Sequence, residues 1–199
     1  MDTNDFSTIS IRDKIKQGKA GEKFLEHVYS RFFCPINPDV GRFLCKQSID
    51  FTKRNLSVTY LIIDKVTEEL VAYFTIAIKP ISVNVSKFSN NMRRKIERVS
   101  EVNEQTGEYL LSAYLIAQLS KNFADGMNER ITGDHLLRLA IEKVKQLQDM
   151  AGGTVVFLEA DNEPKLIEFY KRNGFKRFAT RKSRGTEDQH KLVQLLKVI

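Results

Sequence analysis

The chain has 199 residues, of which 42% are hydrophobic and 29% are charged, and its formal net charge is +7. This composition excludes an intrinsically disordered chain. No apolar run reaches the roughly 18–20 residues of a membrane-spanning helix, and the acidic, polar start lacks the apolar stretch of a signal peptide. We therefore expect a cytoplasmic protein without membrane contact, folded as a single domain over residues 1–199.

Hydrophobic periodicity sets the expected elements. In chain order, the pattern predicts helices over 12–32 and 40–54, strands over 58–64 and 70–83, a polar helix within 87–101, a strand over 109–119, a helix over 136–147, a strand over 154–160, a helix from Pro164 and a last strand over 192–199. Gly18 and Gly21 weaken the first helix. This order predicts an α/β (α+β) fold with a mixed sheet flanked by helices.

Positive charge gathers in two segments. One is 165–191, where nine lysines and arginines stand against three acids: Lys165, Lys171, Arg172, Lys176, Arg177, Arg181, Lys182, Arg184 and Lys191 against Glu168, Glu187 and Asp188. The other lies within 84–108, a segment that interrupts the strands, and comprises Lys87, Arg93, Arg94, Lys95 and Arg98 around Glu97. Such clusters fit a polyanion such as RNA or the phosphates of a nucleotide cofactor, and equally a solvated surface.

The most informative motif lies near the C-terminus. The buried strand 154–160 is followed by the turn Asp161-Asn162, either residue of which can cap the helix that Pro164 begins. The helix carries Phe169-Tyr170 and ends at Gly174-Phe175. This strand–helix–FYxxxGF pattern resembles the acyl-CoA-binding end of the GNAT superfamily of N-acetyltransferases.

The resemblance implies a GNAT fold, with a mostly antiparallel central sheet and a helical insertion, 84–108, between the third and fourth strands. It also implies acetyl-CoA as co-substrate, with the Tyr170 hydroxyl beside the CoA sulfur and with Asn162 and Phe169 at the cofactor. Tyr170 then acts as the general acid that protonates the departing thiolate. The alternative from the residue alone is a half-buried aromatic whose hydroxyl meets water.

The second GNAT signature, a Gln/Arg-x-x-Gly-x-Gly/Ala loop that wraps the pyrophosphate, is partly present over 128–135. In the register we prefer, Gly133 matches the final glycine, Ile131 replaces a glycine and Asn128 replaces Gln or Arg. In the alternative register Arg130 and Gly133 match, and His135 replaces Gly/Ala. The physical requirement is a set of backbone N–H groups at a helix N-terminus.

Within that loop, Arg130 and Thr132 can offset the charges of Glu129 and Asp134 beside a pyrophosphate, and His135 is a candidate phosphate contact. The position of His135 near a helix N-terminus disfavours a cationic ring. By the same resemblance, the backbone N–H of Leu119 or Ser120 polarises the thioester carbonyl. The remaining histidines, His27 and His190, have no assigned role.

No cluster of Cys, His and Asp indicates a metal, and Cys34 and Cys45 are expected to be reduced thiols. No carboxylate is clearly placed as a general base. An acceptor whose amine is already partly neutral near pH 7, such as the α-amine of an aminoacyl ester, does not require one.

The residues upstream sharpen the resemblance. This part of the chain resembles the acetyltransferase toxins of bacterial toxin–antitoxin pairs. The resemblance rests on Phe33-Cys34-Pro35, the apolar helix that follows, and the strands 58–64 and 70–76. These toxins acetylate the α-amine of aminoacyl-tRNA, so the resemblance implies a tRNA acceptor held by Lys87, Arg93, Arg94, Arg98 and the basic segment 165–191. A homodimer and an antitoxin are candidate partners. The alternatives are an acetyltransferase for a small molecule or a protein amine, and a non-catalytic acyl-CoA-sensing or RNA-binding module.

Overall fold

The computed structural model describes residues 5–182 and 191–199, with every side chain among them except that of Lys87. The chain forms two compact units. Unit 1 extends to Ala77 and resumes over Ala117–Lys143, whereas unit 2 comprises Ile78–Ile116 and Val144–Ile199. No helix in the described ranges is long and apolar enough to cross a membrane.

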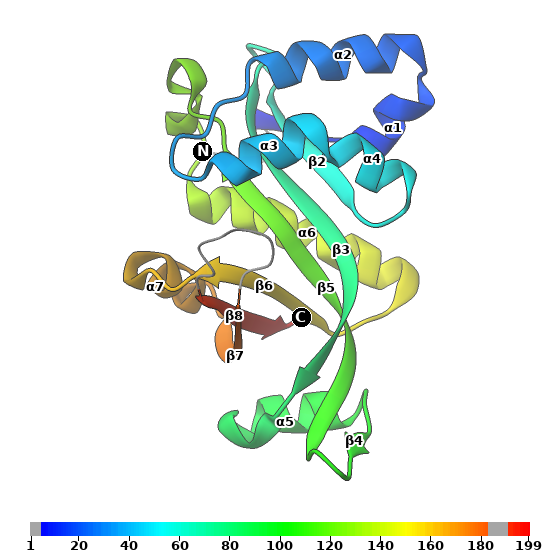
Figure 1. Ribbon diagram of the computed structural model, residues 1–199, viewed down its shortest axis with the longest axis vertical. Helices are drawn as coiled ribbons and strands as arrows, with labels where there is room; N and C mark the ends of the chain where they lie inside the picture. Colours follow the sequence, from blue (N-terminus) through cyan, green and yellow to red (C-terminus); the bar gives the residue numbers. More distant parts are fainter. Residues whose placement is uncertain (1–4, 183–190) are drawn as a thin grey trace. The chain divides into compact units, whose positions relative to one another are not determined.

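The strands of unit 1 are successive neighbours in the sheet, and the first two of their pairings are antiparallel. They are β1 (Phe6–Ser10), β2 (Val58–Asp64), the first part of β3 (Leu70–Val83) and the end of β5 (Glu108–Lys121). β1 pairs with β2 and β2 with β3, and β5 lies beside β3 (Figure 1). The apolar run of β2 is buried along nearly its whole length, which is why a continuous apolar pattern predicts this strand.

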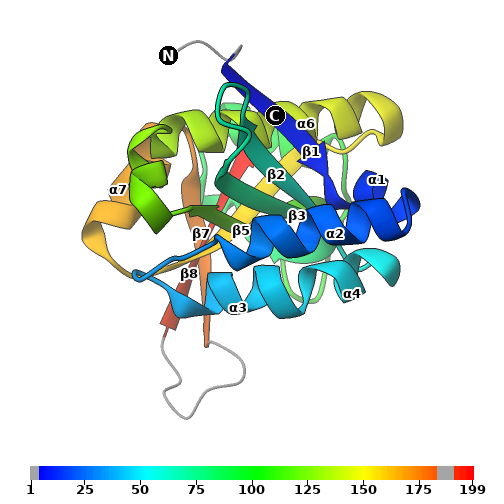
Figure 2. The ribbon, with the colours of Figure 1, turned by 90° about the horizontal axis from the view of Figure 1, so that it is seen from above.

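Helices cover both faces of the unit 1 strands. The helices α1 (Ile11–Lys16), α2 (Lys19–Ser30), α3 (Pro38–Lys46) and α4 (Ser48–Lys53) lie on one face, and the first part of α6 (Gly133–Ala151) lies on the other (Figure 2). Leu25 of α2 and Leu44 of α3 join Leu61 and Tyr73 of the strands in one core. On the opposite face, the Phe6 ring packs edge-on against His135.

The predicted helix over 12–32 is two helices. Gly18 adopts φ = 61°, a conformation that favours glycine, and this residue separates α1 from α2. A Cβ built at Gly21 would lie 1.7 Å from the Lys14 carbonyl oxygen, so this glycine lets the two helices approach closely. The glycines that weaken a single long helix therefore form a tight corner between two short ones.

Unit 2 contains the only parallel strand pair that the described ladders show. Its strands β5, β6 (Val155–Asp161), β8 (Lys191–Val198) and β7 (Lys176–Lys182) pair in that spatial order. β5 and β6 are parallel, whereas β6–β8 and β8–β7 are antiparallel. Helix α7 (Pro164–Arg172) follows β6 and contacts it. The sheet is therefore mixed and mostly antiparallel.

The segment between β3 and β5 belongs to unit 2. It contains the 3-10 turn η2 (Val85–Lys87), the helix α5 (Asn90–Glu97) and the short strand β4 (Val102–Asn103), which pairs with β5. Val85, Phe88 and Ile96 pack against the strand residues Val83 and Leu111 in the core of this unit. The polar helix predicted within 87–101 is α5.

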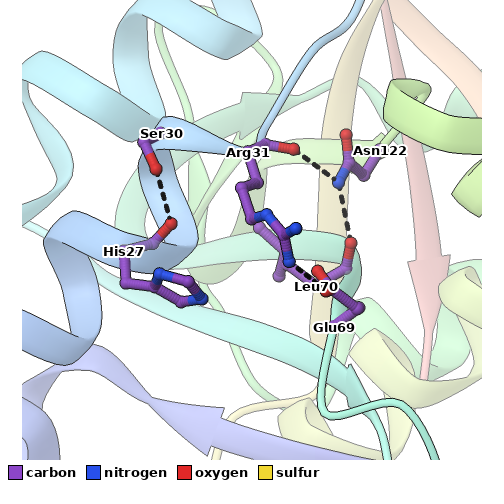
Figure 3. A network of polar contacts seen from close by, with 6 residues as sticks. All are labelled: His27, Ser30, Arg31, Glu69, Leu70 and Asn122. Carbon is purple, nitrogen blue, oxygen red and sulfur yellow. Dashed lines mark hydrogen bonds and ion pairs between the residues drawn. The ribbon is translucent and has the colours of Figure 1, made fainter.

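The amide of Asn122 joins three parts of unit 1. Its side chain is 2% exposed, and its Nδ2 donates to the carbonyl oxygens of Arg31 and Leu70 at 3.0 and 2.8 Å (Figure 3). Its Oδ1 accepts the backbone N–H groups of Phe33 and Ala124 at 3.0 and 3.1 Å. The end of β5, the start of β3 and the α2–α3 connection thus share one buried side chain.

Replacing Asn122 with alanine should destabilise the protein by at least about 2 kcal/mol. The reason is that the substitution leaves several backbone groups without their partner, and each buried orphan costs roughly 1–3 kcal/mol. Urea unfolding followed by circular dichroism measures the loss. Asn91→Ala, at an exposed position of α5, is the matched control and should cost no stability. An Asn122→Ala variant as stable as that control would contradict this account.

Candidate functional site

The loop predicted to hold a pyrophosphate, 128–135, lies in unit 1 and leads into α6. The helix begins at Gly133, and the Thr132 Oγ1 accepts the backbone N–H of His135 at 3.1 Å. The first N–H groups of a helix lack intrahelical acceptors and favour an anion. The predicted loop therefore ends at a helix N-terminus capped by Thr132, the local geometry on which phosphate binding relies.

Ile131 occupies the position where the preferred register expects glycine. Its side chain is 1% exposed and is therefore part of the protein interior. The bulk that replaces the glycine thus does not extend into solvent from the loop. In this chain a side chain at position 131 need not obstruct a ligand at the start of α6.

Arg130 is anchored rather than extended. Its Nη1 donates to Asp64 Oδ2 at 2.7 Å, and Asp64 Oδ1 also accepts the backbone N–H groups of Val66 and Thr67. Burial raises the pKa of Asp64, but the bonds from Arg130, Thr67 and Val66 outweigh it and bring that pKa below its ordinary value. The carboxylate fixes Arg130 at the end of β2 and offsets part of its charge.

His135 faces the interior of unit 1. The side chain is 6% exposed, and burial followed by the charge of Arg138 lowers its pKa, so that the ring is neutral at pH 7. Within the described part of the chain its Nε2 has no hydrogen-bond partner. The ring thus packs against Phe6 at the start of α6, and its contact with a CoA phosphate stays a prediction.

Leu119 and Ser120 lie near the end of β5 in unit 1. Leu119 is half-buried and Ser120 is 7% exposed. The Ser120 hydroxyl donates to the carbonyl oxygen of Lys121, whose own Nζ donates to the Asn128 carbonyl at 2.7 Å. Lys121 therefore links the end of β5 to the first residue of the predicted pyrophosphate loop.

Tyr170 lies on α7 in unit 2, in the last turn before the Gly174 stop. The side chain is 8% exposed and packs edge-on against Phe169 and Phe175, with ring centroids 4.9 and 5.8 Å away. Burial raises the pKa of Tyr170 to about 12, so the hydroxyl keeps its proton at neutral pH. Gly174 has φ = 86°, as the predicted helix end requires.

The start of α7 differs from the prediction in one respect. Its N-cap is Glu163, without a side-chain capping bond, and neither Asp161 nor Asn162 occupies the cap position. Pro164 at the first helical position already fixes the backbone there, which lessens the need for a capping side chain. Asn162 is exposed and Phe169 is half-buried beneath the Arg172 guanidinium, so both remain accessible to a ligand.

The β6 strand loses one neighbour before the other. Its pairing with β5 ends at Leu158, whereas its pairing with β8 continues to Asp161. Glu159, the first residue of β6 beyond its pairing with β5, forms an ion pair with Arg181 and accepts a hydrogen bond from Gln194. Arg181, counted from the sequence as part of the basic segment, is therefore neutralised within unit 2.

The two basic clusters are mostly on the surface. In unit 2, Arg94, Lys95 and Arg98 are exposed, and Arg93 pairs with Glu97 at 2.6 Å. In the basic segment 165–191 the exposed members are Lys165, Lys171, Arg172, Lys176, Arg177, Lys182 and Lys191. Arg184, Glu187, Asp188 and His190 lie outside the described residues, and so does the side chain of Lys87.

Sequence patterns did not single out Asp64 or Asn122. A carboxylate at the end of an apolar strand and before a polar turn is a common turn-forming signal, and it could have identified Asp64. Asn122 has no comparable signal, because three of the four backbone groups that its side chain contacts belong to Arg31, Phe33 and Leu70, far from it in sequence.

Comparison with solved structures shows that the chain shares the fold of the toxins AtaT and KacT. The sequence matches no protein-family model and no curated protein. The chain matches AtaT complexed with acetyl-methionyl-tRNAfMet, with a TM-score of 0.61 and 16% identity over 95% of this chain and 94% of that one. A tyrosine-to-phenylalanine mutant of KacT matches with a TM-score of 0.63 and 15% identity over 95% and 94%. AtaTR bound with acetyl-CoA matches with a TM-score of 0.58 and 14% identity over 98% and 94%.

Asp64 should make stability depend on pH. Because its pKa is lower in the folded protein than its ordinary value of about 4, its contribution is present above that value and is lost as the pH falls through the folded pKa. Asp64→Asn should be less stable by about 1–3 kcal/mol at pH 7, with a smaller deficit near pH 3. Urea unfolding at both pH values measures this. Asp50→Asn, which removes an exposed pair with Arg54, is the control, and an equal deficit at both pH values would refute the assignment.

Proposed function

We propose that the protein is an acetyl-CoA-dependent N-acetyltransferase, and that its acceptor is the α-amine of aminoacyl-tRNA. The fold supports the first part, because the neighbours with this fold include AtaTR bound with acetyl-CoA. The structure of AtaT with acetyl-methionyl-tRNAfMet supports the second. The observation that carries the proposal for this chain is Tyr170, a buried, protonated phenol on the helix that follows β6.

The reaction needs three contributions. A neutral amine attacks the thioester carbonyl, the tetrahedral oxyanion requires a donor, and the leaving thiolate requires a proton. In the proposal the N–H of Leu119 or Ser120 serves the oxyanion, and Tyr170 serves the sulfur as general acid. The remaining cofactor contacts are Asn162 and Phe169 together with the pyrophosphate loop, namely Asn128, Arg130, Ile131, Thr132, Gly133, Asp134 and His135.

The raised pKa of Tyr170 defines how it would act. A phenol with a pKa of about 12 is a weaker acid than an ordinary thiol of pKa about 8.5, so full proton transfer to a thiolate is uphill. Donating a hydrogen bond to the sulfur as negative charge develops does not carry that cost. The proposed role is therefore a hydrogen bond from the Tyr170 hydroxyl that strengthens as the carbon–sulfur bond breaks, and the proton that the amine releases on acylation balances the one that the thiolate finally takes up.

The acceptor part of the proposal depends on charge. The exposed cations of α5 and of the 165–191 segment can contact a phosphodiester backbone. A polyamine substrate would favour an acidic acceptor pocket, whereas these surfaces are basic. In the proposal, units 1 and 2 are parts of one cytoplasmic acetyltransferase domain. A second copy of the chain and an antitoxin are its further proposed partners. The antitoxin is suggested by the AtaT mutant toxin, which is known bound to the C-terminus of the antitoxin AtaR.

Tyr170→Phe should lower the rate of acetyl transfer to aminoacyl-tRNA by about 10²–10⁴-fold, the range for loss of a general acid. Acetyl-CoA affinity should change little, because the ring remains in place. Tyr29→Phe is the control, since Tyr29 is also buried with a pKa raised to about 12 but bonds Ser48 in unit 1. A Tyr170→Phe rate within threefold of wild type would remove the assignment. Acetyl-CoA binding without transfer to any amine would favour the non-catalytic sensor.

Binding of tRNA should weaken steeply with salt, because each phosphate contact releases counterions. Replacing Arg94 and Arg98 with glutamine should reduce the slope of log affinity against log salt by about 1–2. Filter binding between 50 and 200 mM salt measures the slope, a range in which about six phosphate contacts would cost roughly 10³-fold. Arg54→Gln, at an exposed residue of unit 1, is the control. A salt-independent affinity would argue against a nucleic-acid acceptor.

A further inference from the structure

The connection between α2 and α3 is held to the end of β5 through the backbone of Phe33. The Phe33 N–H donates to Asn122 Oδ1 at 3.0 Å, and the Phe33 carbonyl oxygen accepts the N–H of Phe123 at 2.7 Å. Both polar groups of its backbone are therefore satisfied by Asn122 and Phe123, the two residues that directly follow β5. This fixes the position of Phe33 within unit 1.

The side chains around Phe33 alternate between the interior and solvent. Phe32 packs edge-on against Tyr73 at 5.3 Å, and Cys34 is 8% exposed within the core. Between them, the Phe33 side chain is 58% exposed. Of all the aromatic side chains in the described ranges, it is the one that the structure exposes to solvent. A rigid backbone therefore presents an unpartnered aromatic ring at a fixed place.

That place is near the strand residues assigned to the thioester carbonyl. Ser120 precedes Asn122 by two residues, which corresponds to about 7 Å along an extended strand. An acceptor whose amine reaches the carbonyl must extend the rest of its structure away from that point. In aminoacyl-tRNA, the amine lies on the amino acid that is esterified to the ribose of the terminal nucleotide, so a single ribose separates it from the terminal base.

We infer that Phe33 is a specificity-determining residue that stacks on the 3′-terminal base of the tRNA acceptor, with Asn122 as its positioning residue. The inference rests on the proposed function. An exposed aromatic ring on an anchored backbone suits the π-face of an unpaired base, and single-stranded ends are recognised in this way. A polyamine or a lysine carries no base that could stack on this ring.

The test compares intact tRNA with the same tRNA lacking its 3′-terminal nucleotide. In wild type, removing that nucleotide should weaken binding by about 5- to 150-fold, the usual value of one stacked base. In Phe33→Ala the intact tRNA should already bind weakly, and truncation should change its affinity by less than about twofold. Phe33→Trp, which keeps a stacking surface, should respond to truncation as wild type does.

Val66→Ala is the matched control, because Val66 is an 88% exposed apolar residue in another turn of unit 1. It should behave as wild type. Thermal unfolding and acetyl-CoA affinity of Phe33→Ala should match wild type, since the ring is exposed. Equal truncation costs in wild type and Phe33→Ala would overturn this inference and leave the acceptor proposal standing. Absence of tRNA binding by a wild-type protein that binds acetyl-CoA would overturn both.

Discussion

The buried amide of Asn122 is the constraint on which the architecture of unit 1 depends. It satisfies backbone groups of the α2–α3 connection and of the start of β3, while its own backbone N–H donates to Val71 at 2.8 Å. The polar groups of a loop that approaches a sheet must find partners, because unpaired buried groups are costly. One side chain directly after β5 meets that requirement, and it holds the backbone of Phe33 in place.

A second polar contact plays the same part for the candidate pyrophosphate loop. Asp64 at the end of β2 accepts from Arg130 and from two N–H groups of its own turn. Together with the burial of Ile131, this fixes the loop from the inside. A loop that lacks the usual glycines can thus keep its backbone at the start of α6. Ile131, which stands where the GNAT-like pattern has a glycine, therefore fills part of the protein interior.

Much of the fold could be predicted from local patterns. The strand β6, the helix α7 and the positive φ of Gly174 follow from an apolar β-branched run, a proline and a glycine within one short segment. By contrast, β1 was not predicted, because its five residues become a strand only by pairing with β2. The sequence likewise predicts one helix weakened by Gly18, because the corner between α1 and α2 depends on the contact of Gly21 with Lys14.

For the candidate site, the sequence identifies residue types but not their surroundings. The pattern around Tyr170 predicts a helix placement that the structure confirms. The surroundings of these side chains depend on residues that are distant in the sequence. Arg130 pairs with Asp64, His135 packs against Phe6, and Arg181 pairs with Glu159. The burial of Ile131 is likewise a property of the folded chain. The exposure of Phe33 between half-buried Phe32 and buried Cys34 is equally invisible in the sequence. The chemistry of the site is therefore a prediction from family resemblance, refined by tertiary contacts.

The most direct test is calorimetric titration of acetyl-CoA into the full chain, freed of any CoA retained through purification. We expect acetyl-CoA to bind with micromolar affinity, because the helix N-terminus and the capped loop can still hold a pyrophosphate. No binding at millimolar acetyl-CoA would contradict the proposed acetyltransferase function and would leave the fold without the proposed co-substrate.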